Sequence, residues 1–337
     1  MVFFVIRRLL AIGVMLVVTS VVTFLLFFAA PTDPAALTCG RECTPDLIDA
    51  NRHAMGLDKP IYVQYGDFVK GLFAGRDFPD DPVQKAQAPE TIVRCEAPCL
   101  GYSFLRQAPV TELVTQALPV TVSLAVGAFV LWMLIGVLAG CVAALYKGRW
   151  LDRLIVGGAL LGYSLPTFFI GLLLLTFVSI RWAILPIPSY TPFLDNPLQW
   201  AAGLVMPWTA LAVVFAAAYV RLTRAYMIES LSEDYVRTAR AKGVREPRVI
   251  VKHGLRVALT PIVTMAGLDL GGLLGGMVVT EQVFGFNGLG KLAVQSVTNV
   301  DLPTIVAVVL VAAAAYTIAN LVVDILYGVI DPRVRLK

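Results

Sequence analysis

The sequence predicts an all-α polytopic membrane protein with six transmembrane helices and an extracytoplasmic loop domain. The 337 residues are 58% hydrophobic and 15% charged, and the mean hydropathy is +0.78. Soluble globular chains carry about 25% charged residues, so the composition indicates a membrane protein. The other two observations are apolar segments long enough to cross a bilayer and an uneven distribution of Lys and Arg among the connecting loops.

Six segments reach the length of about 20 residues that a helix needs to cross the hydrocarbon core. They are residues 9–30, 113–146, 154–180, 196–220, 257–280 and 302–323. The second is longer than one straight span requires, and Asp269 is the single charge in the fifth. Pro166, Pro207 and Pro261 fall in or beside spans, where neighbouring helices can satisfy the carbonyl groups that a proline leaves free.

Basic residues predict the orientation, because Lys and Arg in short loops favour the cytoplasmic side. The basic positions are Arg7 and Arg8, then Lys147, Arg149 and Arg153, then nine Lys/Arg against four Asp/Glu in residues 221–256, and finally Arg333, Arg335 and Lys337. All four groups lie on one side of a six-span arrangement, so both termini are predicted to be cytoplasmic.

Residues 31–110 are then outside, and they hold eight Lys/Arg against eleven Asp/Glu. This stretch contains no apolar run long enough for a seventh span. Part of it, near residues 46–73, is expected to form short amphipathic helices.

The connection between the fourth and fifth spans is long and basic for a simple connector. Residues 235–243 include good helix formers, and Gly243 can end a helix in the left-handed conformation. A short helix there would present the small residues Ala239, Ala241 and Gly243 to a partner protein. The alternative is that the Lys and Arg side chains only bind anionic lipid, and charge alone does not decide between the two.

This connection also carries a family resemblance. Residues 234–243, DYVRTARAKG, resemble the signature of binding-protein-dependent ABC permeases of the dipeptide/oligopeptide type (DppB/OppB-like). Five further segments are similar to family motifs, in the same order along nearly the whole chain. They are 55–65 (MGLDKPIYVQY), 164–168 (SLPTF), 267–276 (GLDLGGLLGG), 285–290 (GFNGLG) and 331–335 (DPRVR).

Two departures accompany the resemblance. The first departure lies in the loop between the fourth and fifth spans. Arg237-Thr238-Ala239 stands where the wider superfamily has Glu-Ala-Ala, and Arg256 stands near the position of a superfamily proline. Both differences are common in the peptide-type branch. The second departure is the cysteine-bearing insertion in the outside loop, which leaves the role of that loop open.

The resemblance implies a type I ABC importer permease fold and a permease subunit of the cell (plasma or inner) membrane. The permease would translocate di- or oligopeptides or, alternatively, nickel chelates or other small solutes. Its partners would be a second permease subunit, two cytoplasmic ATPase subunits that bind ATP and Mg, an extracytoplasmic substrate-binding protein and the lipid bilayer. This chain would hold no cofactor and no ATPase site, and would bind no nucleic acid.

The same resemblance implies a division of the chain. Residues 1–110 would form the first span with the loop, 111–330 a five-helix core with a cytoplasmic coupling loop at 221–256, and 331–337 a cytoplasmic tail. The coupling helix, seated in an ATPase cleft, would consist of Arg237, Thr238, Ala239, Arg240, Ala241, Lys242 and Gly243.

Other function classes have weaker support. Residues 285–291, GFNGLGK, resemble a phosphate-binding loop, but Leu292 stands where that motif needs a hydroxyl to hold the metal. Neither a His-Glu-x-x-His nor a Gly-x-Ser-x-Gly motif occurs, and His53 and His253 are predicted on opposite sides of the membrane. An intramembrane enzyme is therefore disfavoured, and a channel or secondary transporter, which needs no coupling loop, is a remote alternative.

Four cysteines, Cys39, Cys43, Cys95 and Cys99, lie in the outside loop, where thiols oxidise. Four cysteines allow three pairings, and the sequence does not choose among them. A tetrathiolate zinc site is the rival, but Cys-x-x-x-Cys is looser than the usual zinc spacing, so two disulfides and no metal are expected. Cys141, inside the second span, is expected to be a buried small residue.

Two acidic residues are candidates for the substrate pathway. Asp269 lies deep in the fifth span among glycines spaced four apart, a pattern of close helix contact in membranes. An ionisable residue at that depth is a functional candidate, and the alternative is a structural Asp that joins two helices. Glu281 is the second candidate and is expected nearer the hydrated end of the span.

Overall fold

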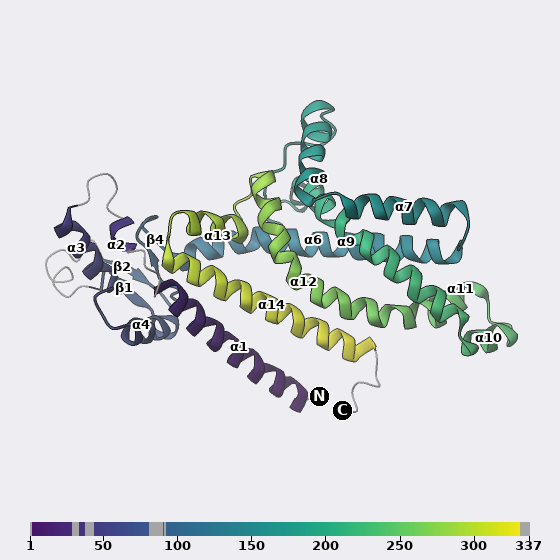
Figure 1. Cartoon of the computed structure of the whole chain (residues 1–337), viewed down its shortest axis with the longest axis horizontal. Coiled ribbons are helices and arrows are strands. Elements are labelled where there is room, and N and C mark those ends of the chain that lie inside the picture. Colours follow the sequence, from purple (N-terminus) through teal and green to yellow (C-terminus); the bar gives the residue numbers. More distant parts are fainter. Residues whose placement is uncertain (1, 29–33, 38–43, 81–89, 91, 331–337) are drawn as a thin grey trace. The chain divides into compact units, whose positions relative to one another are not determined.

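The computed structural model describes residues 2–28, 34–37, 44–80, 90 and 92–330 of the chain, and it is mainly helical. The chain forms two compact units, shown in Figure 1. The first unit comprises residues 1–119 and 287–317, and the second comprises residues 120–286 and 318–337. The division into 1–110, 111–330 and 331–337 stays a prediction, and the predicted cytoplasmic tail lies outside the described residues.

The first unit begins with the apolar helix α1 (Val2–Phe28) and continues with α2 (Pro34–Leu37), α3 (Pro45–Met55) and α4 (Ile61–Ala74). The side chain of Thr44 caps the start of α3 by accepting a hydrogen bond from the Leu47 N–H, and α3 ends at Gly56 in the left-handed conformation, with φ of 69°. α3 and α4 confirm the short helices predicted near residues 46–73.

Two small antiparallel sheets follow. β1 (Arg76–Phe78) pairs with β2 (Val93–Cys95), and β3 (Tyr102–Ser103) pairs with β4 (Ala108–Pro109). Strands of two or three residues are too short for an alternating apolar pattern, so the sequence did not indicate them. α13 (Leu289–Thr298) and the first half of α14 (Leu302–Ile330) complete the unit.

α6 (Val110–Leu145) leaves the first unit and continues into the second. The other elements of the second unit are α7 (Trp150–Ser164), α8 (Thr167–Leu173), the π-helix η2 (Leu174–Arg181), α9 (Pro197–Ser232), α10 (Asp234–Ala241), α11 (Glu246–Arg248), the π-helix η3 (Val249–Leu255) and α12 (Arg256–Phe284). α7 lies beside α9 (Figure 1).

The core of the second unit is built from α6, α9 and α12. Trp132, Tyr219 and Ile262 are fully buried in it. α6 approaches α9 closely at Gly136, where an added Cβ would come within 2.5 Å of the Tyr219 Cβ. A glycine at this position therefore sets the distance between the two helices.

Among the residues that the structure describes, four helices are long and apolar enough to cross a membrane, namely Val110–Leu145, Pro197–Ser232, Glu246–Leu270 and Leu302–Val322. A fifth candidate is the pair Trp150–Ser164 and Thr167–Arg181, which is bent by 101°. The break falls at Pro166, which caps α8 and cannot continue α7, so the third predicted span is not one straight helix. α1 contains a shorter apolar helix, Leu10–Leu26. The structure thus supports a multi-pass membrane protein, and six spans stay a prediction.

Candidate functional site

α10 ends in a complete Schellman motif. The Val244 N–H donates to the Ala239 carbonyl at 3.2 Å, and the Gly243 N–H donates to the Arg240 carbonyl at 2.9 Å. Gly243 has φ of 74°, a left-handed conformation that glycine adopts without a steric penalty. The predicted helix end at Gly243 is confirmed.

The two faces of α10 differ. Val236 and Ala239, three positions apart, are buried against Val249, with Leu231 and Val244 alongside. The residues Arg237, Thr238, Arg240, Ala241, Lys242 and Gly243 are exposed. The sequence-based expectation that Ala239 is offered to a partner is therefore wrong, since Ala239 lies on the face that holds α10 against η3. Ala241 and Gly243 remain available.

Polar contacts fix α10 at both ends. The Arg240 guanidinium forms a bidentate pair with Glu246, with Nε–Oε2 and Nη2–Oε1 distances of 3.1 and 2.6 Å. At the other end, the Tyr235 hydroxyl donates to the His253 carbonyl at 3.2 Å. Just before α10, in the last turn of α9, the Ser230 hydroxyl donates to the Gly254 carbonyl at 3.0 Å. α10 is thus fastened to the segment that leads into α12.

An ion pair between a buried aspartate and a half-buried arginine joins α7 to α9. Asp152 accepts hydrogen bonds from Arg224 Nε at 2.6 Å and Nη2 at 2.8 Å, and a third from the Gly148 N–H at 2.8 Å. The Asp152 side chain is 6% exposed. Sequence reasoning missed this pair. The available signal was one acidic residue within an otherwise basic turn that contains Lys147 and Arg149.

Asp269 lies on α12 and is half-buried. The hydroxyl of Tyr219 on α9 donates to Asp269 Oδ2 at 2.7 Å, and Tyr219 is fully buried beside Trp132. This contact fixes one carboxylate oxygen. Both roles considered for Asp269, lining the pathway and joining helices, agree with such a contact.

Glu281 is fully buried, and Thr121 on α6 donates to its Oε1 at 2.7 Å. The expectation of a hydrated position near the span end is therefore wrong. α12 continues to Phe284 and closes at Gly285, so Glu281 lies within the last turn but faces the protein interior. Asp269 and Glu281 are 12 residues apart on this helix, about 18 Å at 1.5 Å per residue, and the two side chains do not form one small site.

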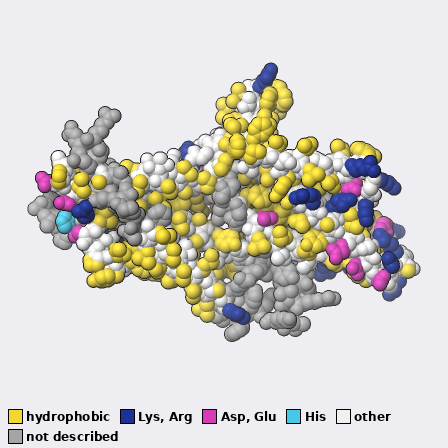
Figure 2. All heavy atoms as spheres, in the orientation of Figure 1, with side chains coloured by type: hydrophobic (Ala, Val, Ile, Leu, Met, Phe, Trp, Pro, Cys, Tyr) yellow, Lys and Arg dark blue, Asp and Glu magenta, His cyan; other side chains and the backbone are white. Residues whose placement is uncertain are grey.

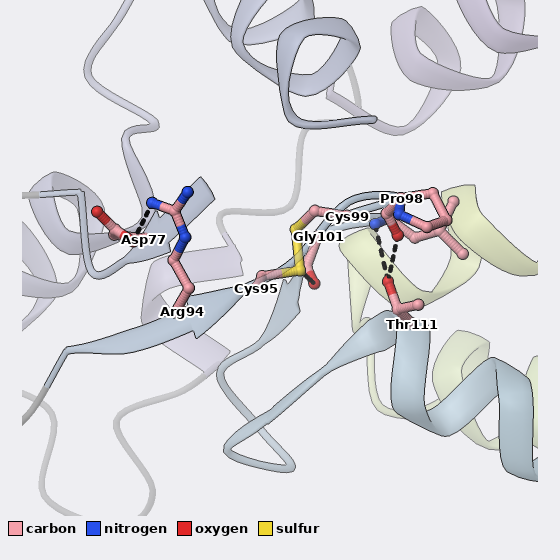
Figure 3. The surroundings of a disulfide bond; sticks show 8 residues. Asp77, Arg94, Cys95, Pro98, Cys99, Gly101 and Thr111 are labelled. Carbon is pink, nitrogen blue, oxygen red and sulfur yellow. Dashed lines mark hydrogen bonds and ion pairs between the residues drawn. A yellow bond between two sulfur atoms is a disulfide. The ribbon is translucent and has the colours of Figure 1, made fainter. Parts of the chain in front are cut away.

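A disulfide joins Cys95 to Cys99 beside the start of α6, as Figure 3 shows. The Thr111 hydroxyl donates to the Pro98 carbonyl at 2.8 Å and accepts from the Leu100 N–H at 3.1 Å. Cys39 and Cys43 lie outside the described residues, so the second disulfide stays a prediction.

The bond between Cys95 and Cys99 excludes their pairing with the first cluster in this structure, and it occupies two of the four thiolates that the rival zinc site would need. Cys141 is half-buried rather than buried.

The sequence matches the family model described as "Binding-protein-dependent transport system inner membrane component" over residues 136–336. The N-terminal model of the same system, "Binding-prot-dependent transport system membrane comp, N-term", matches residues 1–125. The chain belongs to this family. It is thus an inner-membrane permease component of a binding-protein-dependent ABC transport system, as the resemblance indicated.

Related permeases match along almost their whole length. A protein of Brucella abortus (strain 2308) named "Putative peptide transport system permease protein" is 38% identical over 325 residues, which cover 96% of each chain. The "Glutathione transport system permease protein GsiC" of Escherichia coli (strain K12) is 37% identical over 334 residues, which cover 99% of each chain. Among solved structures, the "Crystal structure of an amino acid ABC transporter with histidines" is 23% identical, with a TM-score of 0.44, and covers 66% of this permease and 94% of that chain.

Proposed function

We propose that this permease is one subunit of an ATP-driven importer for short peptides, and that α10 couples it to an ATPase subunit. The observation that carries the proposal is the two-faced structure of α10. Its Val236 and Ala239 face is packed on η3, while Ala241 and Gly243 leave a surface of low bulk exposed. A helix that bound only anionic lipid would need its Lys and Arg side chains, but it would not need an exposed surface of small residues.

The names of the relatives support the substrate class. The relatives in Brucella and Escherichia are named as peptide and glutathione permeases, and both match this chain over nearly its full length. The complete importer would contain a second permease subunit, two ATPase subunits and a substrate-binding protein.

The orientation follows from charge. Figure 2 shows Lys and Arg side chains gathered over α10 and α11, and hydrophobic side chains over most of the face in view. By the positive-inside rule the end with α10 would be cytoplasmic. Both termini would lie on that side, and residues 31–110 would lie outside.

ATP would be bound by the partner subunits. The glycine-rich segment that leads into α13 resembles a phosphate-binding loop. In the first turn of α13, however, Lys291 Nζ donates to Asn287 Oδ1 at 2.9 Å, and Leu292 is buried. A residue without a hydroxyl at that position cannot hold the metal of a bound nucleotide. The permease would therefore use the free energy of hydrolysis in another chain.

Proteoliposomes test this function. The tagged permease is purified from membranes with its partners, reconstituted with the binding protein, and supplied with a labelled dipeptide. We expect ATPase chains to co-purify and uptake to require ATP. Peptide uptake by the permease without any ATPase chain would contradict the proposal.

A further inference from the structure

The first unit contains a partly open cavity lined by aromatic side chains. The cavity has a volume of about 100 Å³ and is bounded by α1, α3, α4, the short strands and the turn between α13 and α14. Its aromatic lining residues are Phe24, Phe68, Phe78, Tyr102 and Phe104. An apolar cavity of about 150 Å³ holds a benzene molecule. This cavity therefore suits one apolar side chain of a larger molecule.

Arg76 supplies an unused hydrogen-bond donor in the wall. Its Nε is buried and has no hydrogen-bond partner, while Nη2 lies 3.7 Å from Asp80. The guanidinium also lies over the Phe78 ring, 5.0 Å from its centroid. Gly71 lies next to the Arg76 side chain: a Cβ atom added at Gly71 would lie 3.8 Å from the Arg76 Cβ. A buried guanidinium N–H without an acceptor is unfavourable, and a carboxylate is its best partner.

The acidic side chains of the wall already have donors. Asp67 pairs with Lys59 at 3.2 Å, and Asp301 accepts from the Ser103 and Thr304 hydroxyls at 2.6 and 2.7 Å. Both carboxylates are therefore engaged by other donors, and among the described lining residues Arg76 is the basic side chain that could receive an anionic group.

Backbone strain is located at another lining residue, Val300. Val300, in the turn between α13 and α14, has φ of 55°. A β-branched residue rarely adopts this conformation, and strained residues concentrate at ligand sites. The turn is held by hydrogen bonds from the Asp301 N–H to the Ser296 carbonyl at 2.9 Å and from the Asn299 N–H to the Gln295 carbonyl at 3.0 Å.

A disulfide supports the aromatic part of the lining. The disulfide-bonded Cys95 and Cys99 pack with Phe78, and Tyr102 and Phe104 lie against this cluster. The Phe78 and Tyr102 rings are stacked at 5.4 Å. The aromatic surface that would receive an apolar side chain is therefore already formed in the free protein.

We propose that this cavity binds the C-terminal residue of a short peptide, with its apolar side chain between the aromatic rings and its carboxylate on Arg76. The peptide identity rests on the proposed function, whereas the required chemistry, an apolar side chain beside a carboxylate, rests on the cavity. A surface segment of the binding protein could supply the same chemistry, and the experiment separates the two sources.

The test uses the complete permease and ATPase complex in lipid nanodiscs. Peptide binding is measured without the binding protein, and capture of added binding protein is measured separately. The probes are the dipeptide Gly-Leu and its C-terminal amide, and binding is measured by calorimetry. Arg76→Gln removes the donor, and Leu105→Trp fills the rim, where Leu105 lines the cavity and is 44% exposed. The matched controls are Arg94→Gln, whose side chain is 61% exposed, and Leu47→Trp on α3, where Leu47 is 41% exposed.

We expect wild-type complex to bind Gly-Leu saturably and its amide at least about tenfold more weakly, because a charge-assisted hydrogen bond is lost. Arg76→Gln should weaken Gly-Leu binding by a similar factor, Leu105→Trp should abolish it, and both controls should bind as wild type.

Absence of saturable Gly-Leu binding to the wild-type complex, or equal binding by Arg76→Gln, Leu105→Trp and the controls, overturns the proposal. So does a result in which Leu105→Trp weakens only the capture of added binding protein, which would assign the cavity to that protein. ATP-dependent uptake in the same preparation reports separately on the proposed function.

Discussion

The hydroxyl of Tyr219 donates a hydrogen bond to a carboxylate oxygen of Asp269 across 2.7 Å, and it thereby joins α9 to α12 within the membrane-spanning part of the second unit. The Tyr219 ring is fully buried, whereas Asp269 is only half-buried. The donor therefore fixes one oxygen of a carboxylate that is partly accessible.

We predict that Asp269→Asn lowers peptide uptake by at least about fivefold while assembly stays normal. The amide oxygen can still accept from Tyr219, so the helix contact is preserved and only the charge is lost. Uptake per assembled complex in proteoliposomes is the measurement. Asp269→Leu, which removes the acceptor, should also impair assembly. Normal uptake and assembly in both variants would remove Asp269 from the pathway.

For the coupling helix, Ala241→Trp is predicted to abolish ATP-driven uptake while the subunit still inserts in the membrane. Ala241 is exposed, and the substitution keeps every charge, so only the shape of the contact surface changes. Ala241→Ser, which keeps the small size, is the control. The measurements are co-purification of ATPase chains and uptake; wild-type values for Ala241→Trp would favour the lipid interpretation of the loop.

Ala239→Trp does not make the same test. Ala239 is 8% exposed and packs with Val236 and Val249, so a large ring there would displace α10 from η3. We expect this variant to reduce the amount of folded subunit in the membrane, which quantitative blotting measures. Normal levels of Ala239→Trp would contradict the packing described for α10.

Removal of one partner of the Asp152–Arg224 pair should destabilise the permease. Loss of one side of a fully buried pair costs about 3–5 kcal/mol. Because the Arg224 side chain is 29% exposed, we expect a smaller loss of about 2 kcal/mol for Asp152→Asn. Thermal unfolding of the purified complex measures it, and Arg245→Gln, at an exposed position, is the control. Equal melting temperatures for Asp152→Asn and wild type would disprove a stabilising role.

The loop cysteines give a direct chemical prediction. Unreduced peptide mapping should find Cys95 linked to Cys99, and we expect a second link between Cys39 and Cys43. A closed loop this short contributes about 2 kcal/mol by restricting the unfolded chain. Mass spectrometry with thiol alkylation checks both bonds. Recovery of alkylated Cys95 and Cys99 from native protein would contradict the structure.

Sequence reasoning recovered the features that depend on local pattern. The apolar segments and the end of α10 at Gly243 follow from composition and spacing along one helix, whereas the role of Asp269 stays a prediction. Ala239 was assigned to the wrong face because the phase of a short helix depends on what it packs against. The pair Asp152–Arg224 joins residues 72 positions apart, and such contacts leave no periodic signal.

The same limit applies to the cavity. Arg76 and Val300 meet at one cavity although they are far apart in the chain, and no motif connects them. The cysteine pairing was open from spacing alone, and the structure resolves it for Cys95 and Cys99. Tertiary structure, rather than pattern, decided each of these features.

α11, η3 and α12 form one continuous helical segment from Glu246 to Phe284, and α12 bends along its length (Figure 1). α10 rests on Val249, the first residue of η3, and the segment carries Asp269 and Glu281 farther along. A π-helix holds its turns by i→i+5 hydrogen bonds and is wider than an α-helix. If η3 lost one residue from its turn, everything beyond it would rotate by about 100°, the angle per residue of an α-helix. Movement of α10 against η3 would therefore change the direction in which the Asp269 and Glu281 side chains point from α12.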